Sequence, residues 1–187
     1  MKRSILALAV LVVAAAARLF AGDAAPAAAA PPGDLSFTCH NTVYNAEGHF
    51  TSWHFTKLDI PGGDLTKGTV ELEVDLASVN EKTAKLAAHL RTPDFFDAAK
   101  FQKATISISG AKAGADKHYT ATAAIDLHGM KGTCPVVFEV VSEKPLTIKG
   151  TATLDRSTFG IGQPYDTGDK YSPTNEVAIA INAKLTD

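Results

Sequence analysis

The sequence has no run of basic residues, and its charges nearly balance. Its 187 residues include 18 Lys and Arg against 20 Asp and Glu, which gives a net charge of −2. Residues 1–22 contain Lys2, Arg3 and Arg18 and no acidic residue, so the remainder of the chain carries 15 basic and 20 acidic residues, or −5. A mildly acidic chain without a basic patch argues against nucleic acid as a partner and against electrostatic binding to anionic lipid.

Cysteine is scarce as well, with Cys39 and Cys134 the only two in the chain. Their wide spacing excludes a zinc knuckle and a C-x-x-C redox motif. In an oxidising compartment such a pair can form a disulfide, and two buried free thiols are the alternative. Both residues fall on strand-like segments, and nothing in the sequence shows that these strands adjoin. The disulfide therefore stays open, and we favour free thiols.

Motifs of catalysis and metal binding are also missing. The sequence has no H-E-x-x-H or G-x-S-x-G motif and no nucleotide-binding loop. The histidines form no tight metal spacing on one predicted element; they are His40, His49, His54, His89, His118 and His128. For His89 and His128 we expect hydrogen bonds that anchor loops. We therefore expect no enzyme, no metal site and no cofactor.

The first residues have the pattern of a secretory signal. Lys2 and Arg3 precede an apolar run over residues 5–17, which is shorter than the roughly 20 residues that a membrane-spanning helix needs. We assign residues 1–22 to a signal peptide with an uncertain cleavage site, residues 23–33 to an Ala- and Pro-rich linker, and residues 34–187 to one globular domain. An uncleaved anchor is the alternative. The assignment predicts a periplasmic or secreted bacterial protein.

Most of the remaining chain alternates apolar and polar residues. Along 70–76, four apolar residues alternate with three acidic ones, the period of a strand with one dry face and one wet face. Similar runs occupy 35–39, 106–108, 119–127, 148–154 and 177–185, and Gly-rich turns separate them. The pattern predicts an all-β fold, an antiparallel up-and-down β-barrel of about eight strands.

One helix is predicted in the domain, after Val79. Asn80 is a candidate N-cap, Leu86 and Leu90 lie one turn apart, and Pro93 ends the helix. Two adjacent phenylalanines, Phe95 and Phe96, follow in a polar connector. A loop gains nothing by exposing such a pair, so we expect the two rings to cover an apolar interior.

The segment HLRTPDFFD at residues 89–97 resembles the HLRxxDFFD signature of the YceI-like family. Further similarity lies in 74–79 (IxxxSV), 126–129 (LxLHG) and 154–161 (RxxFGI), so the matches extend over roughly 69–185. The start of the domain departs from the family, because Glu47-Gly48-His49-Phe50 stands where an RGxF-like turn is usual. The resemblance implies a lipocalin-like periplasmic barrel that binds polyisoprenoid lipids, with the helix capping the barrel.

Small inward residues on two predicted strands leave room inside such a barrel. Ala121 and Ala123 share the dry face of one strand, and Gly150 and Ala152 share that of another. Bulky neighbours that fill this room are the alternative. Arg156 is a candidate partner for the carboxylate of Asp94 or Asp97, and an exposed pair worth at most about 1 kcal/mol is the alternative. The residues expected to contact a ligand are Phe37, Trp53, Leu72, Val74, Leu90, Phe95, Phe96, Ile106, Ala121, Ala123, Ile125, Phe138, Ile148 and Phe159.

The resemblance and the predicted cavity together indicate a carrier. The expected ligand is one elongated apolar molecule, such as an isoprenoid quinone, a polyprenyl lipid or a fatty-acid derivative. A solid structural or adaptor barrel without ligand, and an accessory of a lipid-modifying enzyme, are the alternatives. The residues leave open whether the chain forms a homodimer.

Overall fold

The computed structural model describes residues 30–185 of the chain. The predicted signal segment and most of the predicted linker lie outside the described residues. The described part contains ten strands, and they are β1 (Gly33–His40), β2 (Asn45–Phe50), β3 (Trp53–Asp59), β4 (Thr69–Asp75), β5 (Val79–Glu81), β6 (Lys103–Ala113), β7 (His118–Leu127), β8 (Met130–Glu143), β9 (Leu146–Asp155) and β10 (Glu176–Lys184).

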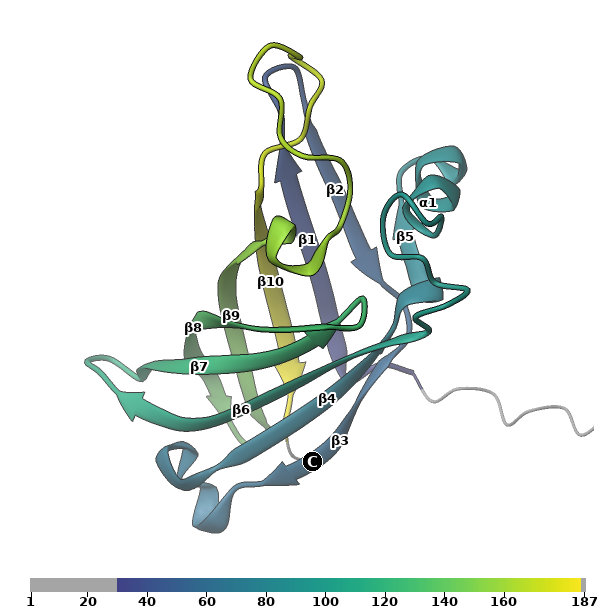
Figure 1. Cartoon of the computed structure of the whole chain (residues 1–187). Helices are drawn as coiled ribbons and strands as arrows, with labels where there is room; N and C mark the ends of the chain where they lie inside the picture. The colour runs from purple at the N-terminus through teal and green to yellow at the C-terminus, as the bar shows by residue number, and fades with distance from the viewer. Residues whose placement is uncertain (1–29, 186–187) are drawn as a thin grey trace, which may run out of the picture.

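One helix and four short 3-10 turns complete the described part. These elements are α1 (Ala84–Leu90), η1 (Pro61–Gly63), η2 (Leu65–Lys67), η3 (Leu76–Ser78) and η4 (Arg156–Phe159). The strands form one antiparallel sheet in the order β3-β4-β6-β7-β8-β9-β10-β1-β2-β5. This sheet curls into a half-barrel, and α1 lies beside β5 at the rim (Figure 1). The all-β barrel class expected from the sequence is confirmed.

The ten strands amount to eight, because two pairs of consecutive strands are each one long strand interrupted by a bend. β2 continues through Thr51 and Ser52 into β3, and β4 continues through η3 into β5. The two bent segments pair on both sides of the bend, Phe50 with Val79 and Trp53 with Val74. The Thr51 N–H donates to the Ser78 carbonyl at the bend itself. These contacts bring the two ends of the sheet together, so an interior is enclosed.

The alternation of side chains decides which face of the sheet is enclosed. On β4, Leu72 and Val74 are buried, whereas Glu71 and Glu73 remain partly exposed on the other face. Across from β4, β6 is paired in regular register, with Leu72 opposite Ile106. Because the side-chain period of a strand is two, this register places the apolar sets of neighbouring strands on the same face. The apolar faces therefore line one common interior.

The predicted helix exists, but it begins later than expected. Asn80, the predicted N-cap, belongs to β5 and pairs with His49 of β2. The observed N-cap is Thr83, whose hydroxyl accepts a hydrogen bond from the Leu86 N–H at 3.2 Å. Pairing of this segment with the sheet thus displaced the helix start by three residues. Among the described residues, no helix is long and apolar enough to cross a membrane.

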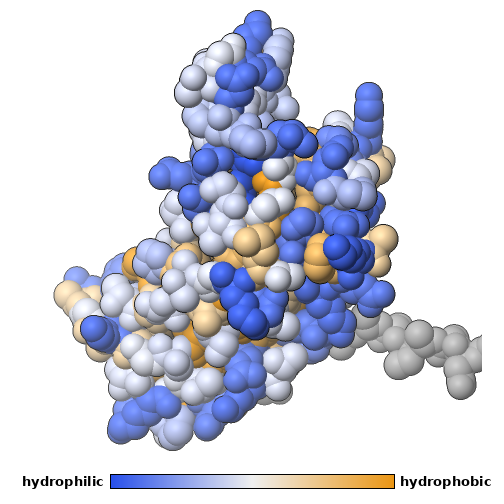
Figure 2. Space-filling model, in the orientation of Figure 1, coloured by the Kyte–Doolittle hydropathy of each residue, from blue (hydrophilic) through white to orange (hydrophobic). Residues whose placement is uncertain are grey.

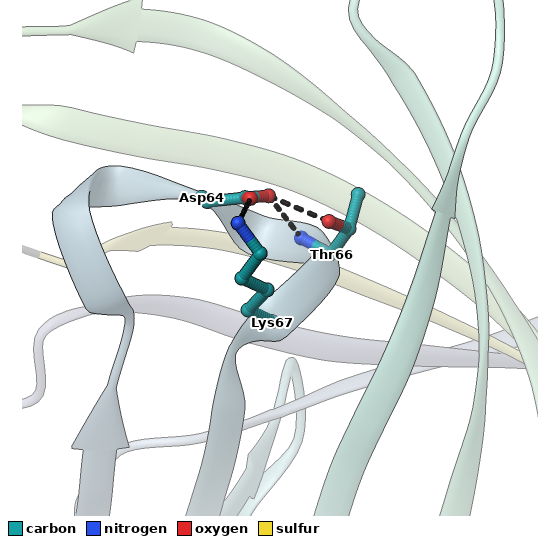
Figure 3. A network of polar contacts seen from close by, with 3 residues as sticks. All are labelled: Asp64, Thr66 and Lys67. Carbon is teal, nitrogen blue, oxygen red and sulfur yellow. Dashed lines mark hydrogen bonds and ion pairs between the residues drawn. The ribbon is translucent and has the colours of Figure 1, made fainter.

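The turn between β3 and β4 closes the end of the barrel that lies away from α1 (Figure 1). Asp64 organises this turn (Figure 3). Its carboxylate accepts hydrogen bonds from the Thr66 N–H at 3.0 Å and the Thr66 hydroxyl at 2.6 Å, and it forms an ion pair with Lys67 at 2.9 Å. The turn presents Leu65 inward, where it is buried and lines a small cavity of about 60 Å³.

Candidate ligand-binding cavity

A cavity of about 400 Å³ occupies the barrel between the closed end and α1. Its wall consists of inward side chains from the curled sheet, and the loop after α1 covers part of its rim. Apolar side chains show through the polar surface in the middle of the face in Figure 2, below the projecting hairpin of β1 and β2. The cavity is lined mainly by aliphatic and phenyl groups, so water gains few partners inside it.

Small residues keep this interior open. Ala123 is only 2 % exposed, lines the cavity and pairs with Cys134 of β8. Gly150 and Ala152 line the cavity from β9. Longer side chains at these positions would extend into the space. The row of small residues that makes room for the cavity was therefore predictable from the sequence, although Ala121, expected in the same row, does not line the cavity.

Three aromatic rings meet at the rim of the cavity. Phe96 lies 5.7 Å from Phe50 and 6.3 Å from Phe37, measured between ring centroids, and all three residues line the cavity. Phe37 and Phe50 are themselves 5.7 Å apart. Phe95 also lines the cavity and contacts the ring of His89 at 4.9 Å. The two adjacent phenylalanines thus cover an apolar interior, as expected.

Backbone hydrogen bonds fix the loop that carries these rings. The Phe96 N–H donates to the Leu90 carbonyl at 3.0 Å, and the Asp97 N–H donates to the Thr92 carbonyl at 2.9 Å. Asp97 adopts a positive φ of 44°, which reverses the chain after the phenylalanines. The Arg91 side chain ties the loop to the barrel by donating to the carbonyls of Ala77 at 2.7 Å and Val79 at 2.5 Å.

Nine of the fourteen residues expected at a ligand line this cavity. The structure brings together side chains from β1, β4, β6, β7, α1 and the loop that follows it. They are Phe37, Leu72, Val74, Leu90, Phe95, Phe96, Ile106, Ala123 and Ile125.

The other five expected residues lie elsewhere in the barrel. Trp53 is buried beside Phe55 of the same strand, with its indole nitrogen lacking a hydrogen-bond partner. Phe138 and Ile148 line the small cavity at the closed end instead. The remaining two are Phe159, which packs over Gly132 from η4, and Ala121, which contacts the core outside both cavities. Strand parity indicates the inward face but not the depth along the barrel, so the sequence does not show which cavity each of these residues lines.

Several lining residues were not expected from the sequence. Leu35, Ile179 and Ile181 lie on two strands, β1 and β10, that adjoin only because the two ends of the domain pair. Their alternation was visible, yet their contact with the other strands depends on a pairing of residues more than 140 apart. Tyr44 and Tyr171 also line the cavity, from the β1–β2 hairpin and the loop before β10, and both are largely exposed.

Both cysteines are free thiols that line the cavity. Strands β9 and β10 separate Cys134 on β8 from Cys39 on β1. Three interstrand spacings place the two Cα atoms about 14 Å apart along the sheet, against the roughly 4.4–6.8 Å of a disulfide. Burial raises the pKa of both thiols. At Cys39, the neighbouring Arg156 opposes this effect and lowers the pKa.

Arg156 does not form the ion pair with Asp94 or Asp97 that we expected. Its guanidinium donates to four backbone carbonyls instead, those of Ile161, Gln163, Pro173 and Thr174. These carbonyls belong to the loop between η4 and β10, which has few regular backbone hydrogen bonds of its own. Carbonyls left unpaired by that loop therefore provide the acceptors.

The histidines form no metal site within residues 30–185, where no group of three or more His, Cys, Asp or Glu can hold an ion. His128 anchors a loop, as expected, through a 3.0 Å hydrogen bond between Nδ1 and the Phe159 carbonyl. His89 contributes its ring to the contact with Phe95 described above. The cavity wall thus offers mainly apolar contact, with a few polar side chains and one guanidinium.

Comparison with known proteins agrees with this architecture. The family model of the YceI-like domain matches residues 32–185. The chain belongs to the YceI-like family. The matched residues include the N-terminal strand β1. No curated protein sequence matches the chain.

Solved structures share the fold of this YceI-like domain at low sequence identity. BcnA of Burkholderia cenocepacia has a TM-score of 0.71 and 20% identity, over 80% of this chain and 94% of that one. The YCEI protein of Campylobacter jejuni has a TM-score of 0.62 and 17% identity, over 79% and 90%. A polyisoprenoid binding domain from Saccharophagus degradans, implicated in plant cell wall breakdown, has a TM-score of 0.58 and 18% identity, over 82% and 92%.

Proposed function

We propose that this YceI-like protein carries one elongated apolar molecule inside its barrel. The observation that carries the proposal is the cavity of about 400 Å³ with an apolar wall. Its volume falls within the roughly 300–1,000 Å³ of small-molecule sites. A protein core without a ligand is packed to nearly crystalline density, with few voids larger than a water molecule. An apolar space of this size therefore favours a guest over a solid structural barrel.

The ligand class follows from the shape and chemistry of the wall. Aliphatic residues of several strands surround the space, among them Leu72, Ile106 and Ile125. Hydrocarbon chains such as those of isoprenoid quinones, polyprenyl lipids or fatty acids suit such a wall, because burial of apolar surface drives their transfer from water. The printed description of the Saccharophagus degradans domain as polyisoprenoid-binding supports the same class.

In this proposal the aromatic rings at the rim close the mouth of the cavity. Phe95 and Phe96 contact the ligand with one face and the barrel wall with the other. Release then requires the loop after α1 to move. The signal-like pattern of residues 1–22 supports a location in the periplasm or outside the cell.

Two matched variants test the proposal. Ala123→Phe adds a phenyl ring inside the cavity, whereas Ala121→Phe adds the same ring on the same strand and face but outside it. Ala121→Phe overpacks the core beside it, at a cost of about 1–3 kcal/mol, whereas the ring of Ala123→Phe extends into the open cavity. The carrier proposal requires that only Ala123→Phe abolishes uptake of a polyprenol or fatty acid. Equal uptake by both folded variants, or no uptake by the parent protein, contradicts it.

A further inference from the structure

Arg156 is the only charged residue that is buried in the part of the chain that the structure describes, with 4 % of its surface exposed. It begins η4, where β9 ends. Its Nε donates to the Thr174 carbonyl at 2.8 Å and its Nη2 to the Pro173 carbonyl at 2.8 Å. Its Nη1 donates to Ile161 at 2.6 Å and to Gln163 at 2.8 Å. All four acceptors are neutral.

No carboxylate within residues 30–185 pairs with this guanidinium, since none of the ion pairs found there includes Arg156. The preceding Asp155 is exposed, and its carboxylate accepts the N–H and the hydroxyl of Ser157. A guanidinium has five N–H donors, so one on Nη2 stays without a protein acceptor. A buried charge without a counter-charge is unfavourable, and an arriving anion would remove that penalty.

The guanidinium belongs to the wall of the apolar cavity. Arg156 and Cys39 both line the cavity, and both donate to the same Thr174 carbonyl, from Nε at 2.8 Å and from Sγ at 3.6 Å. One acidic residue, Glu81, also lines the cavity, but its carboxylate accepts the Thr83 N–H at the start of α1. Arg156 is therefore the only Arg or Lys in a cavity wall that is otherwise mainly apolar, and it lies at the end beside η4.

We propose that Arg156 receives the anionic head group of an amphiphilic ligand, a carboxylate or a phosphate at the end of one hydrocarbon chain. The inference rests on the proposed carrier function and specifies its ligand class. Arginine suits such heads because its planar donors match oxyanions and its charge persists at all working pH values. The chain of the ligand fills the apolar tube, and the head reaches the remaining N–H on Nη2.

Matched lipids test the head group separately from the cavity. Palmitate is compared with hexadecanol, and geranylgeranyl phosphate with geranylgeraniol, by displacement of the neutral probe N-phenyl-1-naphthylamine from the full chain. Each anion is expected to bind about 10- to 100-fold tighter than its alcohol, the range of one charged hydrogen bond. The pair with the larger difference in affinity shows whether the site prefers a carboxylate or a phosphate. Equal affinity within both pairs overturns the head-group inference and leaves the carrier function intact, whereas failure of all four to bind contradicts the carrier function.

The variant Arg156→Met removes the charge and is expected to abolish the preference for the anion while hexadecanol still binds. Arg156→Lys is the matched variant that keeps the charge and retains a preference. Circular dichroism and thermal unfolding are used to check that each variant is folded. A preference that persists in folded Arg156→Met overturns the inference.

Arg156 donates hydrogen bonds to four carbonyls, so Arg156→Met can fail to fold. In that case a measurement on the parent protein tests the inference. Alkylation of Cys39, resolved from Cys134 by peptide mass spectrometry, is followed against pH with saturating palmitate or hexadecanol. A carboxylate beside Arg156 offsets the guanidinium charge and raises the pH at which Cys39 reacts, whereas the alcohol leaves it lower. Identical profiles with the two lipids overturn the inference.

Discussion

The ring of Phe96 meets the ring of Phe37 edge to face, with centroids 6.3 Å apart and planes at 79°. Phe37 belongs to β1, the first strand, and Phe96 to the loop after α1. This contact joins the loop that closes the cavity to the barrel wall. Phe50 of β2 also takes part, because its ring centroid lies 5.7 Å from that of Phe96. Opening the cavity therefore requires breaking contacts between aromatic rings of three separate segments.

Phe96→Ala is expected to loosen this closure. The half-buried ring is worth about 1–3 kcal/mol of stability, less than the roughly 3–5 kcal/mol of a fully buried phenylalanine. Release of bound lipid, followed by stopped-flow dilution, becomes faster because the rim is open. Phe95→Ala is expected to speed release as well, but without breaking the Phe37–Phe50–Phe96 cluster, because Phe95 contacts His89 instead. If release and affinity are unchanged in folded Phe96→Ala, Phe96 contributes only to packing and does not contact the ligand.

Gly48 lies directly beneath the ring of Phe37, its partner across β1 and β2. A Cβ on Gly48 would stand 2.3 Å from Cζ of that ring. Gly48→Ala must push the ring towards the cavity, and we expect a loss of about 1–3 kcal/mol. Phe37→Leu removes the clash, so the double variant is expected to lose less than the sum of the two single ones. Thermal unfolding of all four proteins measures this coupling, and additive losses contradict the contact.

Much of the barrel follows from local patterns in the sequence. Period-two alternation on β4 and β7 indicates which side chains face inward, and the Phe95-Phe96 pair indicates a covered interior. The start of α1 was misplaced because Asn80 has the chemistry of a cap, yet its segment gains more by pairing with β2. Local propensity carries no information about such a pairing partner.

Local sequence patterns also do not predict how deep in the barrel a residue lies. Ala121 and Ala123 have the same parity and the same side chain, but only Ala123 lines the large cavity. Their difference depends on how β7 is staggered against its neighbours. The buried Arg156 was expected to pair with a carboxylate, and its true acceptors are carbonyls that a long loop leaves free. Neither the stagger nor the path of that loop is encoded in short motifs.

Asp64 makes stability depend on acid pH at the closed end of the barrel. The hydrogen bonds from Thr66 and the ion pair with Lys67 lower the pKa of Asp64 to about 2, from an ordinary value of 3.8. A lowered pKa stabilises the fold fully above pH 3.8, and this contribution is lost as the pH falls towards 2. In Asp64→Asn, the melting temperature is expected to change less with pH between pH 3.8 and pH 2 than it does in the parent protein. A parent and a variant that fall in parallel between pH 4 and pH 2 contradict this role.

The two thiols are expected to be free in the folded protein. Alkylation under denaturing, non-reducing conditions should modify both Cys39 and Cys134. In the native state both should react slowly, because burial raises the pKa of each thiol and the thiolate is the reactive form. A protein in which neither cysteine is modified after denaturation contains the disulfide, and the separation of β1 and β8 described above is then wrong.

Native mass spectrometry of the protein, exported after expression of the full chain and purified without detergent, tests the carrier function most directly. The account predicts one apolar molecule per chain, which organic solvent extracts and which added lipid replaces. It also predicts that folded Ala123→Phe is isolated empty, whereas Ala121→Phe retains the molecule. A parent protein that is always isolated empty, and that takes up neither a polyprenol nor a fatty acid, would contradict the account.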